Sequence, residues 1–437
     1  MSVNAKEKKM KAAFYTLGCK VNQYETQALG EALVKEGFLI VPETQEADVY
    51  IINSCTVTAE SDKKTRQAVR RFKREHPTSV VVLTGCMPQA YPAAAAELIQ
   101  ADIVAGNRNN HKLPEMIISY LESRNRTVNV EEHEKDESFT VCSISSFDER
   151  TRAAIKIEDG CNRFCSYCII PYARGRVRSK PLDEIKKEAQ ALAENGFEEI
   201  VLVGINLSSY GTDCELTLCD AVKAVCEVDK VKRVRLGSLE PDHMTEEMIA
   251  GLRAQKKLCP QFHISLQSGC SATLERMNRH YDAPEYEQIC KALRSGFEDC
   301  TITTDVMVGF AGETDEEFAQ SLEFVKTIGF EKVHVFPYSQ REGTRAAKFP
   351  GQLDRRTKQE RAKKMADTAN EIRKNYLKSQ IGKTVEVLAE TKADNGSCTG
   401  YTANYTPVVI KSGAECSRFY TVKITAADND SCYGEII

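Results

Sequence analysis

Residues 155–179 read IKIEDGCNRFCSYCIIPYARGRVRS and carry the most specific pattern in the chain. Its alternation of apolar and polar residues predicts a strand, and three cysteines follow at positions 161, 165 and 168. A closed zinc site takes four ligands, usually as two pairs, and this triplet has no Cys or His close behind it. A four-iron cluster can accept three thiolates and leave one iron open to a small ligand. The stretch therefore predicts an iron-sulfur site just after a strand.

The composition is that of a soluble globular protein. The chain has 437 residues, of which 42% are hydrophobic and 28% charged, and this length suits about two to four domains. The N-terminus lacks an apolar signal segment and no apolar run reaches roughly 18 to 20 residues, so we expect a cytoplasmic protein without a membrane segment. The 17 cysteines are an odd number in a chain without a secretion signal, which favours metal or redox chemistry over disulfides.

A second set of cysteines lies in residues 9–125, where a short apolar strand, a turn and a helix repeat. Three of the β-rich runs end near Cys19, Cys55 and Cys86, which are 36 and 31 residues apart. The repeat predicts a small α/β domain with a parallel sheet, and parallel strands bring their carboxyl ends to one edge. We therefore expect these three thiols to lie close together in space.

The rest of the chain divides by pattern. Residues 126–150 are polar and acidic, which predicts a linker. Six strand-helix units within 151–375 are typical of a doubly wound sheet or of an incomplete barrel, a partial (β/α)6 fold, with strands expected at 153–158, 199–205, 234–239, 262–266, 301–308 and 332–338. Residues 376–437 hold short alternating strands between Gly, Asn and Asp turns, which predicts a small C-terminal antiparallel β-barrel.

The motifs together resemble a known family. CNRFCSYC, with Tyr167 before its last cysteine, resembles the CxxxCxxC signature of the radical SAM superfamily. TLGCKVNQYET, INSCTVTAESDKK and LTGCMPQ, followed by VGINLSSYG, SLQSG and VGFAGET, resemble the methylthiotransferases of that superfamily, which join a three-cysteine domain, a radical SAM barrel and a TRAM barrel. GCKVN and RMNRHY look most like the branch that acts on tRNA with N6-threonylcarbamoyladenosine next to the anticodon.

The resemblance implies two 4Fe-4S clusters and S-adenosylmethionine (SAM) as cofactors. It implies that Cys161, Cys165 and Cys168 hold the cluster that binds SAM and gives a 5′-deoxyadenosyl radical. It implies that Cys19, Cys55 and Cys86 hold an auxiliary cluster, which carries the sulfur that is methylated and passed to carbon 2 of the adenosine. An electron donor such as flavodoxin or ferredoxin is an expected partner.

The resemblance also implies SAM contacts at the strand ends of the barrel. They are Tyr167, Asn206, Glu240, Ser265, Gln267, Asp305 and Gly309. Strand-end polar residues also cap helices, and that alternative stays open. Ala311 stands where the family usually has Pro, so we expect a less restrained loop there.

Basic residues predict contacts with RNA phosphates. Residues 62–75 carry seven Lys or Arg against two acids, and residues 354–378 carry nine against four. The candidate RNA contacts are Arg66, Arg70, Arg74, Arg174, Arg176 and Arg178. The alternatives are a solvated helix face for the first three and ion pairs with the acidic linker for the last three. Tyr401 and Tyr405 could stack on bases or fill and cover the C-terminal barrel. The other cysteines, and the histidines at 243, 263, 280 and 334, are assigned no role.

Three alternatives to the leading function stay open. The same chemistry could act on isopentenyladenosine in tRNA or on an aspartate of a ribosomal protein. From a different class, the chain could be a non-catalytic iron-sulfur protein that binds RNA.

Overall fold

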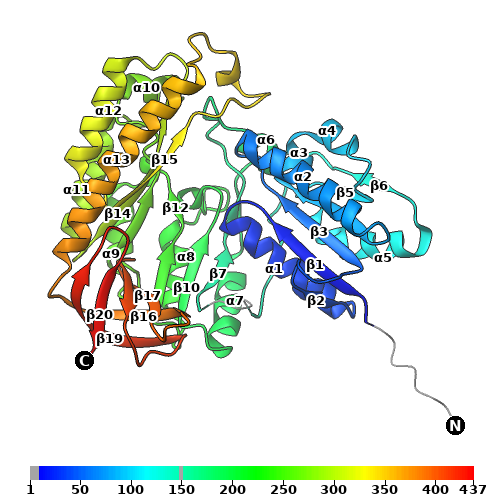
Figure 1. Ribbon diagram of the computed structural model, residues 1–437, viewed down its shortest axis with the longest axis horizontal. Helices are drawn as coiled ribbons and strands as arrows, with labels where there is room; N and C mark the ends of the chain where they lie inside the picture. Colours follow the sequence, from blue (N-terminus) through cyan, green and yellow to red (C-terminus); the bar gives the residue numbers. More distant parts are fainter. Residues whose placement is uncertain (1–8, 147–150) are drawn as a thin grey trace.

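The computed structural model describes residues 9–146 and 151–437 (Figure 1). The first eight residues, on which the expectation of no signal segment partly rests, and the last four of the predicted linker lie outside this range. No helix in the described part of the chain is long and apolar enough to cross a membrane.

The N-terminal domain is a sheet of six parallel strands in the order β2-β1-β3-β4-β5-β6, as predicted for a parallel α/β domain. Helices α1 and α5 pack on one face of the sheet through Leu33 and Ile117, and α2 packs on the other face through Phe72. The strands are β1 (Lys11–Thr16), β2 (Leu39–Val41), β3 (Val49–Ser54), β4 (Val80–Gly85), β5 (Ile103–Ala105) and β6 (Thr127–Asn129). The helices are α1 (Lys20–Lys35), α2 (Ala59–Glu75), α3 (Cys86–Ala90), α4 (Pro92–Ala96) and α5 (Leu113–Ser123).

Strand β6 lies in residues that the sequence pattern assigned to the linker. It pairs in parallel with β5, so the sheet continues by one strand into the polar stretch. The chain then crosses to the second domain, where the carbonyl of Cys142 accepts hydrogen bonds from Tyr24 Oη and from Lys180 Nζ. These bonds attach the crossing segment to both domains.

The second domain has parallel strands in two sheets, β7-β10-β11 and β12-β13-β14-β15. Only Gly237 lies between β11, which ends the first sheet, and β12, which begins the second. Neighbouring strands of the domain therefore follow the order of the chain. A doubly wound sheet would reverse its strand order, so the sequential order supports the barrel-type alternative. The strands are β7 (Ala153–Lys156), β10 (Glu199–Val203), β11 (Arg233–Leu236), β12 (Ser238–Leu239), β13 (Gln261–Ile264), β14 (Thr301–Val308) and β15 (Lys332–Pro337).

Helices cover the outside of this partial barrel (Figure 1). They bury their apolar faces against alternate strand residues such as Phe262 and Ile302, while residues between these face the lumen. The covering helices are α7 (Leu182–Glu194), α8 (Leu218–Cys226), α9 (Glu246–Arg253), α10 (Ser271–Arg276), α11 (Ala283–Gly296), α12 (Asp315–Ile328) and α13 (Arg355–Ser379). The short hairpin β8 (Glu158–Asp159) and β9 (Arg178–Ser179) encloses α6 (Ile170–Arg174).

The C-terminal domain is a closed five-stranded barrel, as predicted, in the order β16-β17-β18-β20-β19. One pair, β18 with β20, is parallel, which corrects the expectation of an antiparallel barrel at that seam. The strands are β16 (Thr384–Lys392), β17 (Cys398–Thr402), β18 (Pro407–Ile410), β19 (Arg418–Ala427) and β20 (Cys432–Ile436).

This small barrel sits against the amino-terminal ends of the second domain's strands. Arg235 of β11 donates to the carbonyl of Ala403 over 2.9 Å. The rings of Tyr401 and Tyr405 stack with their centroids 4.4 Å apart, and Arg152 lies over both. The two tyrosines therefore cover a domain interface, which favours the covering role over base stacking.

Candidate functional site

The first three cysteines lie at the carboxyl ends of neighbouring strands. Cys19 precedes α1 after β1, Cys55 follows β3, and Cys86 begins α3 directly after β4. Gly18 has φ +119°, and a Cβ added there would lie 3.0 Å from Cβ of Cys55. The bare backbone of this glycine lets the two loops approach each other, so the fold brings together the thiols that the sequence separates.

Burial disfavours the thiolate form of two of these thiols, Cys55 and Cys86, in the protein alone. It raises the pKa of Cys86 to about 12, although the charge of Arg174 acts in the opposite direction. Burial also raises the pKa of Cys55, and the neighbouring Cys19 raises it further. A bound iron would supply the positive charge that stabilises thiolates in such surroundings, so the set suits a metal cluster.

The second triplet lies in the loop after β8. Gly160 has φ +87°, and a Cβ there would meet the carbonyl oxygen of Arg176 at 1.8 Å, so only glycine fits. Cys161 N donates to the carbonyl of Gly175 over 3.0 Å, which closes the loop. Burial raises the pKa of Cys161 to about 12 and also raises that of Cys168, where the other two thiols add to the effect.

A cavity of about 160 Å³ opens beside this triplet. Cys165 and Cys168 line it together with Phe164, Asn278 and Arg345. The space next to the two thiols is thus accessible to a small ligand.

Arg279 is a site residue that the sequence analysis missed. Its guanidinium donates to Sγ of Cys165 over 3.3 Å and to Tyr167 Oη over 3.4 Å, and it forms an ion pair with Glu240. Its side chain is only 3% exposed. Arg279 lies in the RMNRHY stretch, which the sequence marked as characteristic without giving it a function.

The predicted SAM contact Asn206 lies directly beside the triplet. Asn206 Nδ2 lies 3.8 Å from Sγ of Cys161, and the Asn206 backbone N donates to Glu158 over 2.7 Å. Oδ1 of Asn206 and Oε1 of Glu158 are buried and have no hydrogen-bond partner among the described residues. Burial raises the pKa of Glu158 to about 8. Glu158 carries no signal in the sequence, since a carboxylate in an alternating strand is an ordinary feature.

Further predicted contacts line the strand ends from β13 to β14. Gln267 has φ +65°, donates its N–H to the carbonyl of Asp305 and accepts from Met307 N, so it joins the two strands. The carbonyl of Ser265 accepts from Arg279 over 3.3 Å. Gly309 N donates to Glu313 over 2.9 Å.

The loop that contains Ala311 is fixed by contacts with its surroundings. Ala311 is buried, and Gly312 N beside it donates to the carbonyl of Gly351 over 2.9 Å. Glu313 forms an ion pair with Arg361 of α13 over 2.6 Å. These contacts connect the loop to Gly351 and to α13, and the lower restraint expected from Ala311 stays a prediction.

Two histidines that were assigned no role approach Asp305 in the barrel lumen. His263 Nε2 lies 3.3 Å from Oδ2 of Asp305, and its Nδ1 lies 2.9 Å from Thr303 Oγ1. A ring nitrogen of His334 lies within 4.8 Å of a ring nitrogen of His263 and of a carboxylate oxygen of Asp305. Burial lowers the pKa of His334, so its ring favours the neutral form. The lumen near the predicted SAM contacts is therefore polar.

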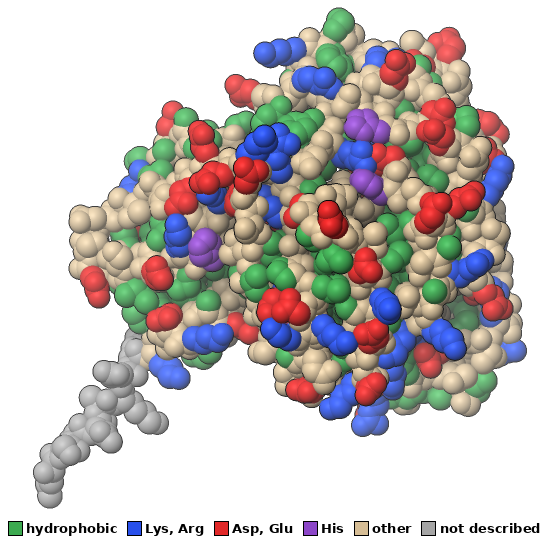
Figure 2. All heavy atoms as spheres, turned by 180° about the vertical axis from the view of Figure 1, so that it is seen from behind, with side chains coloured by type: hydrophobic (Ala, Val, Ile, Leu, Met, Phe, Trp, Pro, Cys, Tyr) green, Lys and Arg blue, Asp and Glu red, His purple; other side chains and the backbone are tan. Residues whose placement is uncertain are grey.

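The structure separates the predicted RNA contacts into two groups. Arg70 and Arg74 are exposed on α2, Arg66 is half-buried there, and Arg176 is exposed in its loop. Basic and acidic side chains are interspersed over the face shown in Figure 2, in line with the net charge of −4. Arg66, Arg70, Arg74 and Arg176 stay predictions as RNA contacts.

The structure contradicts the prediction that Arg174 and Arg178 contact RNA phosphates. Arg174 is fully buried and Arg178 nearly so, because their guanidinium groups pair with Asp159 in the interior. Neither can reach an RNA phosphate in this conformation. The alternative of an ion pair with the linker holds in part, since Arg178 lies 4.0 Å from Glu137.

Both cysteine sets border the contact between the first two domains. Arg174, which ends α6 in the second domain, donates from Nε to Sγ of Cys86 over 3.2 Å. Arg341, also of the second domain, forms an ion pair with Asp62 of α2 and donates to Thr56 next to Cys55. The interdomain contact thus runs from the N-terminal triplet to α6, the helix that follows Cys168.

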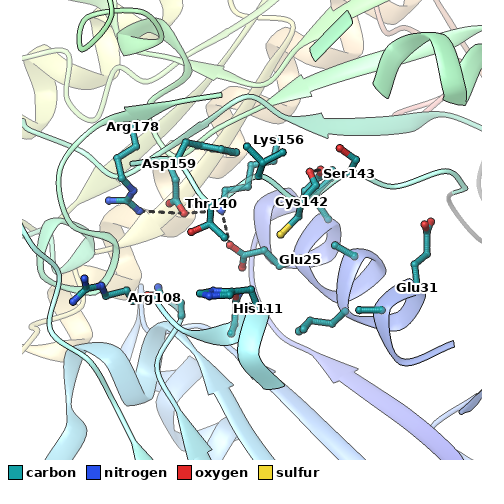
Figure 3. A pocket seen from close by; sticks show the side chains of 18 of the residues that line it. Glu25, Glu31, Arg108, His111, Thr140, Cys142, Ser143, Lys156, Asp159 and Arg178 are labelled. Carbon is teal, nitrogen blue, oxygen red and sulfur yellow. Dashed lines mark hydrogen bonds and ion pairs between the residues drawn. The ribbon is translucent and has the colours of Figure 1, made fainter. Parts of the chain in front are cut away.

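A cavity of about 270 Å³ adjoins this region (Figure 3). It lies between α1 and the crossing segment around Cys142, and Glu25, Lys156, Asp159 and Arg178 line it. The charged groups on its wall already pair with one another.

Comparisons with protein families follow the three domains. A family described as uncharacterized protein family UPF0004 matches residues 11–106, the radical SAM superfamily matches residues 155–325, and the TRAM domain matches residues 378–437. These ranges cover strands β1 to β5 of the six-stranded sheet, most of the partial barrel and the small C-terminal barrel.

Curated relatives align over nearly the whole chain. The chain is 38% identical to the threonylcarbamoyladenosine tRNA methylthiotransferase MtaB of Bacillus subtilis, over 95% of this chain and 94% of the relative. It is 37% identical to MtaB of Aquifex aeolicus, over 87% and 92%. A tRNA-2-methylthio-N(6)-dimethylallyladenosine synthase of Caldicellulosiruptor saccharolyticus is 33% identical, over 97% and 91%.

Solved structures share the fold at low sequence identity. The radical S-adenosylmethionine methyltransferase TsrM from Kitasatospora setae, with cobalamin and a 4Fe-4S cluster bound, matches with a TM-score of 0.57 at 15% identity. The match covers 76% of this chain and 75% of TsrM. The cobalamin-dependent radical enzyme OxsB matches with a TM-score of 0.54 at 11% identity, over 83% and 56%.

Proposed function

The chain belongs to the radical SAM methylthiotransferase family, and from this premise we propose that it attaches a methylthio group to carbon 2 of N6-threonylcarbamoyladenosine next to the anticodon of tRNA. One observation carries the proposal. Two sets of three cysteines lie at the carboxyl ends of strands in two domains, and Arg174 and Arg341 of the second domain contact the first domain at Cys86 and next to Cys55. This arrangement suits a reaction that needs two clusters near one substrate.

The residues present fit the implied cofactors. Cys161, Cys165 and Cys168 would hold the 4Fe-4S cluster that binds SAM, and Cys19, Cys55 and Cys86 would hold the auxiliary cluster. When bound, the clusters and SAM supply radical chemistry, which the unreactive C–H bond at carbon 2 of adenine requires. A one-electron donor such as flavodoxin or ferredoxin would reduce the protein.

The chain's own groups would position SAM beside the first triplet. The free acceptors Oε1 of Glu158 and Oδ1 of Asn206 suit the ammonium group of a methionine. Arg279 would keep Tyr167 and Glu240 in place beside the same triplet. The side of SAM away from the triplet would be lined by the remaining predicted contacts, which are Ser265, Gln267, Asp305 and Gly309.

Two observations favour the threonylcarbamoyl substrate over dimethylallyladenosine. The four MtaB relatives are 34 to 38% identical to the chain, against 33% for the dimethylallyladenosine enzymes. The lumen residues His263, Asp305 and His334 are polar, which suits an arm with a carboxylate and a hydroxyl better than an apolar arm. A ribosomal-protein substrate has no such support.

The test compares two tRNAs in separate reactions. The anaerobically reconstituted protein is incubated with SAM, a reductant and tRNA bearing either threonylcarbamoyladenosine or isopentenyladenosine, and the nucleosides are weighed after digestion. A methylthio gain on the first tRNA alone is expected. Gain on the second alone would refute the substrate, and absence of both product and 5′-deoxyadenosine would favour the non-catalytic RNA-binding alternative.

A further inference from the structure

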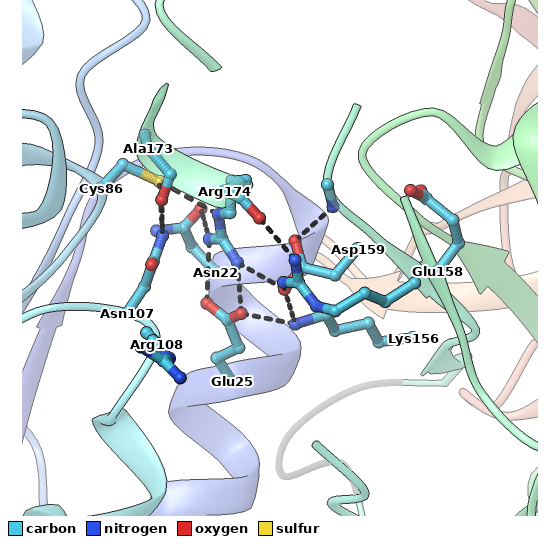
Figure 4. A network of polar contacts seen from close by, with 12 residues as sticks. Asn22, Glu25, Cys86, Asn107, Arg108, Lys156, Glu158, Asp159, Ala173 and Arg174 are labelled. Carbon is cyan, nitrogen blue, oxygen red and sulfur yellow. Dashed lines mark hydrogen bonds and ion pairs between the residues drawn. The ribbon is translucent and has the colours of Figure 1, made fainter. Parts of the chain in front are cut away.

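Arg174 is a fully buried charged side chain at the contact between the two cluster domains. It is 0% exposed although it carries five N–H donors, and each of its three guanidinium nitrogens has a partner (Figure 4). Nε donates to Sγ of Cys86 over 3.2 Å, while the two terminal nitrogens contact both carboxylate oxygens of Glu25. A planar fork held at three points has one orientation, so its direction toward Cys86 is fixed.

The Nε–H of Arg174 points at Sγ of Cys86, and the strength of this sulfur as a hydrogen-bond acceptor changes when it binds metal. A neutral thiol accepts hydrogen bonds weakly, whereas a metal-bound thiolate is anionic and accepts a charge-assisted bond. The arrangement is therefore best satisfied when Cys86 is a cluster ligand. Asn107 Nδ2, which belongs to the same domain as Cys86, lies 3.9 Å from the same sulfur.

Arg174 also reaches the surroundings of Cys19. One of its terminal nitrogens lies 3.3 Å from Oδ1 of Asn22, and the Cys19 thiol donates to that same oxygen over 3.3 Å. Asn22 and Glu25 both belong to α1, whose first residue follows Cys19. One side chain from the radical SAM domain thus contacts the structure around two of the three N-terminal cysteines.

We propose that Arg174 is a positioning residue for the auxiliary cluster, which sets the cluster's reduction potential through the hydrogen bond to Cys86 and fixes its place relative to the radical SAM domain. This rests on the proposed function, in which Cys19, Cys55 and Cys86 hold a cluster. Hydrogen bonds and positive charge at a cluster sulfur stabilise the added electron and raise the reduction potential. Loss of the bond therefore lowers that potential.

Arg341 provides a matched control. Like Arg174, it is a buried arginine of the second domain that pairs with a carboxylate of the first, Asp62. Its guanidinium donates to Asp62, Thr56 and Tyr91, and none of these bonds is to a cysteine sulfur. Arg341→Lys therefore disturbs the same domain contact without removing a hydrogen bond to a cluster ligand.

The experiment measures the potential of the auxiliary cluster directly. Arg174→Lys and Arg341→Lys are each made in the full chain with Cys161, Cys165 and Cys168 replaced by Ala, so that the remaining signal in an anaerobic EPR redox titration belongs to the N-terminal triplet. The expected result is a lower midpoint potential for Arg174→Lys and an unchanged one for Arg341→Lys. Loss of iron from the Arg174→Lys protein, but not from the Arg341→Lys protein, would also support the role. Equal potentials and equal iron content in both variants would overturn it.

A second readout uses chains that keep all six cysteines. We expect Arg174→Lys to retain 5′-deoxyadenosine formation but to lose methylthio product by about 10- to 100-fold, the range found for partners of metal ligands. Loss of both products to the same extent in Arg174→Lys and Arg341→Lys would also overturn the proposal. A parent protein that carries both clusters and leaves every tRNA unmodified would refute the proposed function, while the comparison of potentials would still decide the role of Arg174.

Discussion

Nε of Arg174 lies 3.2 Å from Sγ of Cys86, and the other triplet repeats this relationship, because a terminal nitrogen of Arg279 lies 3.3 Å from Sγ of Cys165. Each arginine side chain is nearly inaccessible and each forms an ion pair with a glutamate, Glu25 or Glu240. A buried guanidinium without its carboxylate would be costly, so each pair acts as a unit. Each cysteine set is thus supplied with one fixed cationic donor.

Replacement of Arg279 should impair the SAM site. Arg279→Lys removes the fork that connects Cys165, Tyr167 and Glu240, so we expect 5′-deoxyadenosine formation to fall by about 10- to 100-fold. The control is Arg276→Lys, since Arg276 pairs with Glu317 and its side chain is 32% exposed. Equal rates in the two variants, measured by chromatography of 5′-deoxyadenosine, would remove Arg279 from the site.

The auxiliary triplet should be separable from SAM cleavage. A Cys55→Ala protein is expected to lose the iron of one cluster and the methylthio product, yet still form 5′-deoxyadenosine, because its radical SAM triplet is intact. Cys142→Ala serves as the control, since Cys142 is a partly buried cysteine of the crossing segment. Normal product from Cys55→Ala would exclude the N-terminal triplet from the reaction.

Glu158 should make the free energy of unfolding of the cluster-free protein depend on pH. Burial raises its folded pKa to about 8 from an ordinary value of 4.5, so the folded state binds more protons than the unfolded state between these values. The free energy of unfolding therefore falls as pH rises through this window, by at most about 1.4 kcal/mol per pH unit. Glu158→Gln cannot ionise and should weaken this fall. Urea unfolding at pH 5 and pH 8 tests it, and an identical pH dependence in parent and variant would contradict the assignment.

The basic face of α2 should contribute to tRNA binding. Reversing the charge at Arg66, Arg70 and Arg74 is expected to weaken binding and to make its salt dependence shallower, by a slope of about 0.7 to 0.9 for each phosphate that the helix no longer neutralises. Lys291→Glu on α11, another exposed position, is the control. Filter binding across a salt series measures both, and an unchanged slope for the α2 variant would make that helix an ordinary solvated face.

Local sequence patterns predicted the parts of the site that depend on chain order. Both triplets follow strands whose apolar runs are visible in the sequence, and parallel strands leave such residues at one edge. Cys19, Cys55 and Cys86 could therefore be brought together by reasoning alone. The six strand-helix units and the small C-terminal barrel were visible for the same reason.

Contacts between domains could not be predicted in this way. Arg174 and Arg178 stand in a basic loop that resembles a phosphate-binding surface. The docking of α1 buries Arg174 through Glu25, while Arg178 is buried beside Asp159 and Glu137. Tyr401 and Tyr405 resemble exposed stacking residues until the small barrel covers the strand ends around Arg152. Arg279 and Glu158 gain significance from distant partners, which no local pattern contains.

Labelled SAM tests whether this chain transfers a methylthio group to threonylcarbamoyladenosine. The reconstituted protein is incubated with methyl-deuterated SAM, a reductant and tRNA bearing threonylcarbamoyladenosine, and the digested nucleosides are analysed by mass spectrometry. The account predicts a methylthio nucleoside whose methyl group carries the three deuterium atoms, together with 5′-deoxyadenosine. Release of 5′-deoxyadenosine with no labelled methylthio group on the nucleoside would contradict it.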